Sequence, residues 1–583
     1  MPILLVIDSI FALSFSVLNL LRANSYPLLR WCVVALLVVL AWFVPQMGNR
    51  WFGPIERLAS RWARNKRMTV ISVALVAIMG RLALFWAFPV PVPRIGDEFA
   101  YLLIGDTLAH GRLANPPHPM SLYLDTGNVL QHPTYASMFP PAQGAVLAVG
   151  ILLGHPWIGV LLSMAAMCAV VTWMLQGWFP PKWALLGGVL VLLRLHFCCY
   201  WLETYWGGAV AALGGALVLG ALPRLIRWQR FRDSVLMGIG ICLLANSRPL
   251  EGAIFCIPVA VALCAWLISK RVPSPSIRVR GVLLPLSCMV VLTVAFVAYY
   301  NWKVTGSALL MPHMLYQREY INYPIFIWQS IKPPLHYANK QFDDGFNVWV
   351  RSRFRPSWQT EWAALKGWWV YFIGGSSSLL LVVLPCLLRD RRIRLLLAQF
   401  FFCAVGLLVV IYFEPHYAAP LAVTTIALLV QAMRHLRRWQ IRSRPVGIFL
   451  TRMLVLLALA RDTVIVVDAG RNPVNHSWNL DRAQIAKQLE ATPGKHLVLV
   501  HYEPTHFFDQ EWVYNAADID GSKIVWAREI PEVDLEPLIQ YFKDRKVWEV
   551  VADAQPAQLQ PYRLPIAAPG PQPHAREPVR QAP

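Results

Sequence analysis

The feature that most constrains this chain is a series of long apolar runs separated by short basic segments. A membrane-spanning helix needs about 20 predominantly apolar residues. Runs of this kind occupy 3–22, 30–48, 68–88, 157–178, 183–200, 281–301, 368–388, 395–413 and 418–434. Shorter runs, or runs interrupted by glycine or arginine, occupy 207–222, 233–247, 252–269 and 447–463. We therefore expect an all-α polytopic membrane protein with about thirteen transmembrane helices.

Composition and charge support this interpretation. Of 583 residues, 57% are hydrophobic and 15% are charged, whereas about 25% of a soluble chain is charged. Lys and Arg number 53 against 32 acids, an excess that would suggest nucleic acid if it covered one soluble face. The basic residues instead cluster between apolar runs, as cytoplasmic loops do under the positive-inside rule, so we expect no nucleic-acid partner. The clusters lie at 49–67, 223–232, 270–280, 389–394 and 434–445.

This orientation predicts which segments lie on the far side of the membrane. The apolar stretch 142–153 cannot be a span, because counting it would reverse every later segment, and we expect a juxtamembrane helix there. The outer loops are then 89–156 and 302–367, and everything after about 464 is also outside. The cytoplasmic loops are too short for a nucleotide-binding domain of roughly 100 residues or more.

The apolar runs and the change in composition after them divide the chain into four regions. Residues 1–67 hold two extra N-terminal transmembrane helices, the first kept rather than cleaved, and a basic cytoplasmic loop; 68–463 form the transmembrane core. Residues 464–554 read as a small extracytoplasmic α/β domain, and the Pro-, Ala- and Gln-rich 555–583 as a disordered tail. In the α/β domain we expect strands at 497–502, 523–526 and 547–551 and helices at 480–489 and 535–543.

The first candidate site is the carboxylate pair Asp97 and Glu98, just beyond a span. A carboxylate beside lipid, kept neutral by burial or ionised by a cation, is suited to abstract a proton from a hydroxyl. The alternative is a helix start, with Asp97 as N-cap and Glu98 in the first turn.

The second candidate is Glu203, an acid at the outer ends of two apolar runs. Ionisable residues at membrane depth are costly and usually functional. The alternative is an anchor within an aromatic belt, since four aromatic residues flank it.

Cations and hydrogen-bond donors gather on the same outer side, a pattern that suits a phosphate or pyrophosphate whose lipid tail stays in the membrane. They are Arg248, His313, Arg318, His416 and Tyr417. Individually each is better explained by snorkelling or helix capping. Arg81 and Arg194 could join this group, but we expect both to snorkel.

Three motifs resemble the GT-C superfamily of membrane glycosyltransferases, in particular the family 39 and RgtA/B/C/D-like branch that includes protein O-mannosyltransferases and the lipid A aminoarabinose transferase. They are Gly96-Asp-Glu-Phe-Ala-Tyr101, Phe139-Pro-Pro-Ala-Gln-Gly144 and Pro415-His-Tyr-Ala-Ala-Pro420. The resemblance covers roughly 68–463. The two extra N-terminal helices and the C-terminal α/β domain depart from the family pattern, as does Glu203 where some members have Asp.

The resemblance implies an inverting transfer of a sugar from a polyprenyl-phosphate donor to a hydroxyl acceptor of the cell envelope, on the outer face of the inner membrane. Asp97 would be the base or would hold a divalent metal ion, which some members use and others do not. Glu98 and Glu203 would position the acceptor or the metal. Arg248, His416 and Tyr417 would face the donor phosphate.

Two other classes of protein fit a polytopic chain. A polyprenyl-lipid transporter or flippase also needs many spans, but transporters place charged sites near the bilayer midplane, often in repeated halves. Charge is scarce in these apolar runs and no repeat is visible. A non-catalytic assembly protein with an outer binding domain would tolerate loss of Asp97, whereas the enzyme would not.

Overall fold

The structure is a computed structural model of the whole chain. It describes residues 27–269, 276, 278–321, 324–330, 333, 335–336, 358–411, 414–472, 477–504, 506–507, 510–531 and 533–562. The first expected span, at 3–22, and the tail from 563 therefore lie outside the described residues, as does the middle of the second outer loop.

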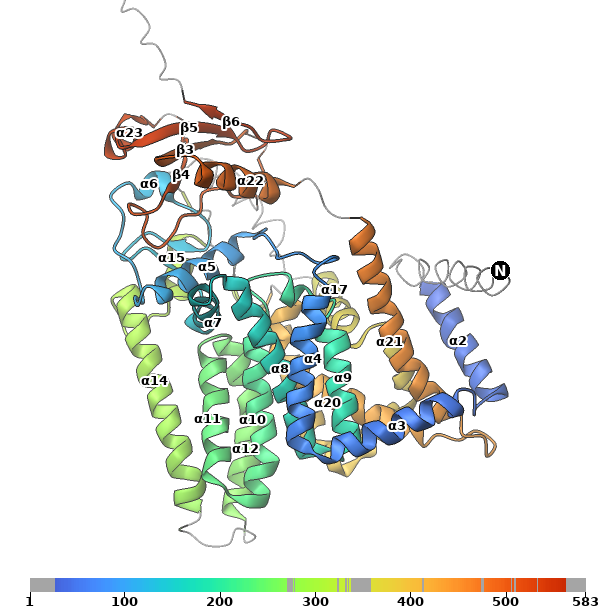
Figure 1. Cartoon of the computed structure of the whole chain (residues 1–583). Helices are drawn as coiled ribbons and strands as arrows, with labels where there is room; N and C mark the ends of the chain where they lie inside the picture. The colour runs from blue at the N-terminus through green and yellow to red at the C-terminus, as the bar shows by residue number, and fades with distance from the viewer. Residues whose placement is uncertain are drawn as a thin grey trace, which may run out of the picture.

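A helical bundle carries a small sheet at one end (Figure 1). The helices before residue 229 are α2 (Pro27–Phe43), α3 (Asn49–Arg64), α4 (Lys66–Ala83), α5 (Gly96–Ala109), α6 (Ser121–Leu124), α7 (Pro141–Leu152), α8 (Pro156–Trp178), α9 (Pro181–Leu195), η1 (Tyr200–Leu202) and α10 (Ala209–Trp228). Next come α11 (Phe231–Ala245), α12 (Pro249–Ile268), η2 (Arg278–Leu283), α14 (Leu284–Thr305), α15 (Pro312–Glu319), α17 (Trp358–Trp368), η3 (Trp369–Ile373), η4 (Ser376–Val383) and α18 (Leu384–Arg389). The last are η5 (Arg391–Ile393), α19 (Arg394–Leu408), η6 (Pro415–Ala418), α20 (Ala419–Arg437), α21 (Val446–Arg471), α22 (Trp478–Ala491) and α23 (Glu536–Tyr541).

Five of the described helices are long and apolar enough to cross a membrane, which makes this a multi-pass membrane protein. They are Pro156–Trp178, Ala209–Trp228, Pro249–Ile268, Arg278–Thr305 and His416–Arg437. A sixth results if Leu365–Ile373 and Ser376–Arg389 form one span, but this pair is bent by 97°. The predicted count of about thirteen is therefore not confirmed, and the expected straight span at 368–388 is broken.

Proline places several helix starts. It stands in the first turn of α7, α8, α9, α12 and α15, where its missing N–H costs no hydrogen bond and its fixed φ suits a helix. The expected juxtamembrane segment 142–153 is indeed a helix of 12 residues, α7, too short to span.

Most of the basic connection expected at 49–67 is a helix, the amphipathic α3. Trp51, Ile55, Leu58 and Trp62 are all exposed on it, at a spacing that puts them along one side of a helix. Arginines occupy the intervening positions. A helix with one apolar and one basic face is suited to lie in the membrane interface, so this segment extends the lower surface of the bundle sideways (Figure 1).

Glycines bring the central helices close together. A Cβ on Gly214 of α10 would meet the carbonyl oxygen of Gly240 on α11, and one on Gly220 would meet the ring of Trp173 on α8. Small residues at such crossings allow close backbone approach, which is the usual basis of helix packing in lipid. The core of the bundle, around α8, α10 and α20, is thereby fixed.

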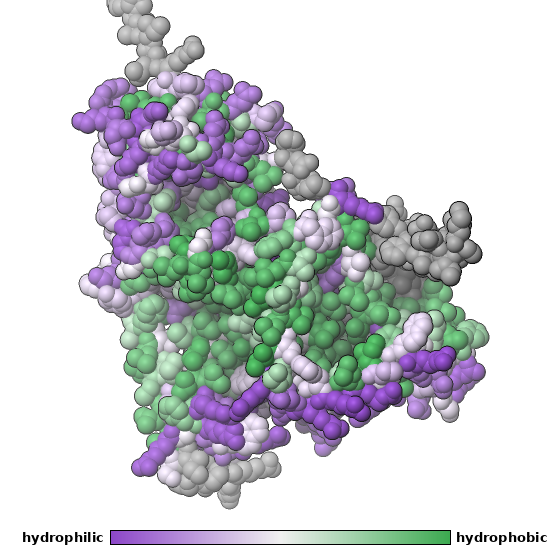
Figure 2. Space-filling view, viewed as in Figure 1, coloured by the Kyte–Doolittle hydropathy of each residue, from purple (hydrophilic) through white to green (hydrophobic). Residues whose placement is uncertain are grey.

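Polarity divides the molecule along the bundle. Figure 2 shows a broad apolar band between a polar cap over the sheet and a polar strip along α3 and the lower helix ends. The expected outer segments 89–156 and 464–562 share the sheet end (Figure 1). The basic clusters near Arg437 and Arg452 lie at the opposite end, where both pair with Glu56 of α3.

The C-terminal region is the expected α/β unit. Its sheet has the order β4 (Ile524–Arg528), β3 (Lys495–His501), β5 (Arg545–Val551) and β6 (Leu559–Pro561). The first three strands are parallel and β6 is antiparallel to β5. Strand β6 lies beyond position 555, where we expected disorder to begin, so the fold continues further than predicted.

Both faces of this sheet are covered. Val498 and Val500 of β3 pack with α22 in one cluster, whereas Leu497 and Leu499 pack with Tyr123 and other residues of the first outer loop in another. A short β1 (Val129–Leu130) and β2 (Ala136–Ser137) hairpin supports that loop. The sheet is therefore docked on the segment that carries the first candidate site.

Candidate active site

The first two motifs pack against each other through helices α5 and α7. A Cβ on Gly144 would overlap the Cβ of Ile104, so only glycine permits this crossing. Tyr101 and Phe139 stack with ring centroids 4.4 Å apart. The first motif, around Asp97, is thus fixed to the second at the sheet end of the bundle.

Glu98 ties the first outer loop to the loop that carries Glu203. It is 1% exposed, and its carboxylate accepts hydrogen bonds from the backbone N–H of Arg94 and of Tyr205, both at 3.1 Å. Burial raises its pKa to about 7, although these two hydrogen bonds oppose the shift. Both oxygens of Glu98 are therefore engaged within the protein, and its predicted catalytic role stays a prediction.

Asp97 has a different environment. The helix begins at Gly96 and its N-cap is Ile95, so the alternative of Asp97 as N-cap is wrong. Its Oδ1 instead accepts a hydrogen bond of 2.7 Å from Nδ2 of Asn128, which has a φ of 64°. This amide orients the half-buried carboxylate.

Glu203 is paired with Arg81. Nη2 of Arg81 donates to Oε1 of Glu203 at 2.8 Å; the arginine is fully buried and the glutamate is 28% exposed. Arg81 also donates to the carbonyl of Phe88, and its guanidinium faces aromatic rings including Trp157. The expectation that Arg81 snorkels is therefore wrong. Burial raises the pKa of Glu203, against the lowering effect of Arg81.

The backbone of Tyr205 joins these parts. Its N–H donates to Glu98, as described above, and its carbonyl accepts from Nε2 of Gln143 in the second motif at 2.7 Å. The same motif donates from the N–H of Ala142 to the carbonyl of Asn246, at 2.8 Å. Asn246 lies two residues before Arg248, so the second motif holds both the Glu203 loop and the Arg248 turn.

Arg248 lies within electrostatic reach of Asp97. It precedes α12 as its N-cap residue, and its guanidinium lies 4.1 Å from the ring centroid of Tyr417. Its charge acts on Asp97, Glu251 and Tyr101. The structure therefore brings together a base candidate from the first motif and an aromatic residue from the third around one arginine.

His416 of the third motif is fully buried. Its Nδ1 is 3.0 Å from the hydroxyl of Tyr200, and its ring lies 4.2 Å from that of Trp206. Among the described residues its Nε2 has no hydrogen-bond partner. The aromatic residues around Glu203 thus do more than anchor the chain in the interface, because two of them hold this histidine.

The second outer loop contributes one of its two predicted residues. His313 on α15 lies within electrostatic reach of Arg248; burial and that charge lower its pKa to about 4. It is therefore a neutral hydrogen-bonding group, and its predicted contact with the donor phosphate stays a prediction. Arg318 is exposed on the same helix, and no hydrogen bond or ion pair joins it to the described residues.

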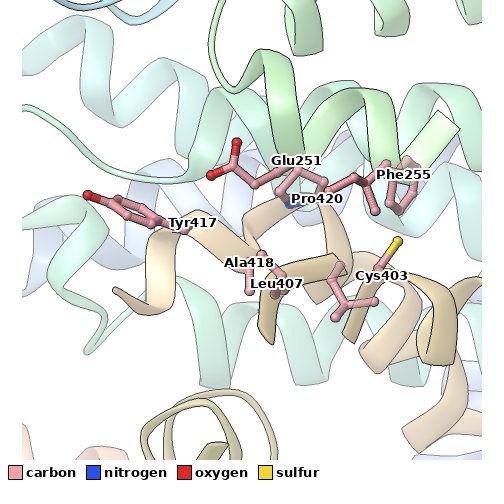
Figure 3. Close-up of a pocket in the computed structure, with 9 residues that line it drawn as sticks. Glu251, Phe255, Cys403, Leu407, Tyr417, Ala418 and Pro420 are labelled. Atoms are coloured by element: carbon pink, nitrogen blue, oxygen red, sulfur yellow. The ribbon is translucent and has the colours of Figure 1, made fainter. Parts of the chain in front are cut away.

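An apolar groove begins at the third motif. It lies between α12, α19 and α20 and is narrow, with a cavity volume of about 10 Å³. Figure 3 shows Glu251 and Tyr417 toward one end and Phe255 and Cys403 toward the other. Nearby side chains on α19, such as Phe401 and Val405, are exposed, as expected of a surface that faces lipid.

The predicted metal ligands do not form a binding site in the described part of the chain. One oxygen of Glu203 is paired with Arg81, and no group of three His, Cys, Asp or Glu residues gathers closely enough to hold an ion among the described residues. Divalent cations require several oxygen ligands. The residues present therefore do not fit the Asp97 and Glu203 metal site, and no step below is routed through one.

Sequence reasoning missed the contribution of the C-terminal domain. Tyr514 stacks on Phe99 with centroids 4.4 Å apart and an interplanar angle of 2°. A Cβ on Gly96 would meet the Tyr514 hydroxyl. The backbone N–H of Ala517 donates to Asp106 at 2.7 Å. Gly96, directly before Asp97, was the available signal in the sequence, because a glycine can mark the close approach of another segment. It does not indicate which segment approaches.

Comparison with known proteins gives structural similarities only. No family model and no curated protein matches the sequence. Apo ArnT from Cupriavidus metallidurans is similar at 13% identity and a TM-score of 0.45, over 84% of this chain and 93% of that chain. ArnT from the same organism bound to undecaprenyl phosphate is similar at 14% identity and a TM-score of 0.45, over 83% of this chain and 92% of that chain. The Archaeoglobus fulgidus oligosaccharyltransferase AglB, in complex with an inhibitory peptide and a dolichol-phosphate, is similar at 12% identity and a TM-score of 0.41. The match covers 83% of this chain and 69% of that chain. Both proteins are glycosyltransferases of the GT-C superfamily, which the three motifs resemble. At these values the similarity carries no argument about activity.

Proposed function

We propose that this chain is an inverting membrane glycosyltransferase that moves a sugar from a polyprenyl-phosphate donor to a hydroxyl acceptor on the outer face of the inner membrane. The observation that carries the proposal is the convergence of Asp97 and Tyr417 on Arg248, beside the mouth of an apolar groove. A base, a phosphate-binding cation and a place for a lipid tail are the three parts that this reaction needs.

Asp97 is the general base of the proposed reaction. The acceptor hydroxyl oxygen attacks the anomeric carbon of the donor sugar and gives its proton to the Asp97 carboxylate. The bond between the anomeric carbon and the phosphate oxygen breaks, and its electron pair leaves with the polyprenyl phosphate. Attack opposite the leaving group inverts the anomeric centre. The Asn128 amide, 2.7 Å from Oδ1, keeps the carboxylate oriented during this step.

Arg248 stabilises the charge that develops on the leaving phosphate. A guanidinium aimed at a position where charge develops contributes most where water is excluded. Tyr417 packs on its face, and the unpartnered Nε2 of buried His416 supplies a further hydrogen-bonding group. Glu251 and Asp97 balance the cation before substrate binds.

The groove between α12, α19 and α20 directs the first isoprene units of the donor toward the lipid. It is lined by apolar side chains, apart from Glu251 and Tyr417 near its mouth, so it offers no partner to a polar chain. The rest of the tail lies against the exposed apolar surfaces of α12 and α19, which include Ile257 and Val405.

The test is sugar transfer from radiolabelled polyprenyl-phosphate sugars in proteoliposomes that contain the full chain. Asp97→Asn should lower the rate by about 10²–10⁴, the usual contribution of a general base. Arg248→Gln should lower it by about 10²–10³. Asp544→Asn, an exposed acid of the sheet domain, is the matched control and should leave the rate unchanged.

Two outcomes would overturn the proposal. Transfer at the wild-type rate by Asp97→Asn, in protein that inserts normally, would remove the base. Movement of labelled lipid between leaflets without sugar transfer would instead assign the chain as a flippase.

A further inference from the structure

Another cavity, this one polar, lies at the opposite end of the bundle. It has a volume of about 340 Å³ and lies between α18, η5 and the last turn of α20. Its position is fixed by two contacts: Arg434 lies over the ring of Phe179, just after α8, and Arg437 pairs with Glu56 of α3. It is therefore remote from Asp97 and has no role in the chemistry proposed above.

Five arginines and one acid among the described residues line this cavity: Arg389, Arg391, Arg392, Arg434, Arg438 and Asp390. Asp390 accepts hydrogen bonds within the cavity, from His435 at 3.0 Å, from Gln431 and from the backbone N–H of Arg392. One carboxylate against five guanidinium groups leaves the cavity with a net positive charge.

The like charges are close enough to repel. Arg392 and Arg438 both act on the charge of Arg434. A bound anion relieves this repulsion, and guanidinium groups bind phosphate oxygens in bidentate geometry. The guanidinium groups therefore favour a phosphate-bearing ligand over a neutral one.

The surface beside the cavity is apolar. Leu381, Leu384 and Leu388, on η4 and α18, are 45%, 39% and 48% exposed. They lead along the chain directly to Arg389 at the cavity. A ligand that fits both features has a phosphate headgroup and hydrocarbon chains.

We propose that this arginine pocket binds the headgroup of an anionic phospholipid, whose acyl chains lie on the leucines of η4 and α18. Basic pockets between membrane helices are suited to such headgroups. Binding there holds the turn between α18 and α19 against the end of α20, and it does not depend on the function proposed for the outer site.

Native mass spectrometry of the full chain in detergent tests the proposal, with dioleoylphosphatidylglycerol and dioleoylphosphatidylcholine as probes. Each arginine near an anionic lipid contributes roughly fivefold in affinity, so Arg389→Gln combined with Arg392→Gln should weaken phosphatidylglycerol binding about 25-fold. Lys543→Gln combined with Lys546→Gln removes two exposed cations from the sheet domain, at the other end of the molecule, and should leave this binding unchanged. Arg389→Lys with Arg392→Lys should retain most of it, which separates loss of charge from loss of fold.

Three results would overturn the proposal: equal binding of the two lipids by the wild type, equal losses in the pocket and sheet-domain variants, or saturation of the pocket by inorganic phosphate with no preference for lipid. The last result would assign the pocket to a soluble phosphate.

Discussion

The pair formed by Arg81 and Glu203 permits a sharp test of how the site is held together. Arg81 is fully buried and Glu203 is 28% exposed, with 2.8 Å between Nη2 and Oε1. Hydrogen bonds to charged groups contribute about 1.5–3 kcal/mol, and leaving a buried charge unpaired costs about 3–5 kcal/mol. The partial exposure of Glu203 moderates both figures, so the two partners should respond differently to substitution.

Glu203→Gln should destabilise the protein by about 3 kcal/mol, since Arg81 then keeps its charge with only carbonyl and aromatic partners. Arg81→Met should cost about 2 kcal/mol, since Glu203 still reaches water. In a double-mutant cycle the coupling free energy should be about 2 kcal/mol. The measurement is the free energy of unfolding of the full chain in detergent micelles, followed by tryptophan fluorescence.

The exposed pair Lys495 and Asp544 is the control for this cycle. Its atoms are 3.9 Å apart and its side chains are 43% and 62% exposed, so its coupling should be about 0–1 kcal/mol. Additive effects of Arg81→Met and Glu203→Gln, with coupling no larger than in this control, would refute the view that the buried pair fixes the Glu203 loop.

Three further predictions concern α5 and its contacts. The pKa of Glu98 rises to about 7 from 4.5 on folding, so its carboxyl ionises at a lower pH in the unfolded chain than in the folded one. As the pH rises from 4.5 to 7, the wild type should therefore lose roughly 3 kcal/mol of unfolding free energy relative to Glu98→Gln. Parallel pH profiles of the two proteins would contradict this. Gly144→Ala should cost about 1–3 kcal/mol, because the added Cβ overlaps Ile104; unchanged unfolding in micelles would contradict the close helix crossing. Tyr514→Ala should increase limited proteolysis between the sheet and the bundle, because it removes the ring that stacks on Phe99. Tyr514→Phe keeps this ring and should not increase cleavage. Equal cleavage of the two variants would show that the stack is not what docks the sheet.

Hydropathy predicted the spans whose helices are uninterrupted. The run at 157–178 corresponds to α8, and 207–222 to part of α10. Hydropathy did not reveal the bend within the span expected at 368–388, because composition does not record the direction of the backbone. Gly374 there has a φ of 77°, and a Cβ on it would meet the guanidinium of Arg194. The Gly-Gly pair was visible in the sequence, but the arginine that packs against it is 180 positions away.

The sequence indicated the residue types of the candidate site, and their roles stay predictions. Tyr417 packs on Arg248, and Asp97 lies within electrostatic reach of it. The function of Glu98 depends on the backbone N–H of Tyr205, and Arg81 depends on Glu203, 122 positions along the chain. Such long-range hydrogen bonds leave no periodic signal, so a buried ion-pair arginine has the same local sequence as a snorkelling one.

The first turn of α5 explains why a C-terminal domain foreign to the family pattern matters to the site. Three consecutive residues there have different partners: Asp97 lies within reach of Arg248, Glu98 binds the bundle through Tyr205, and Phe99 stacks on Tyr514 of the sheet domain. A helix turn points successive side chains about 100° apart, so anchoring the second and third residues fixes the direction of the first. Because one of those anchors belongs to the sheet domain, that domain takes part in aiming the base.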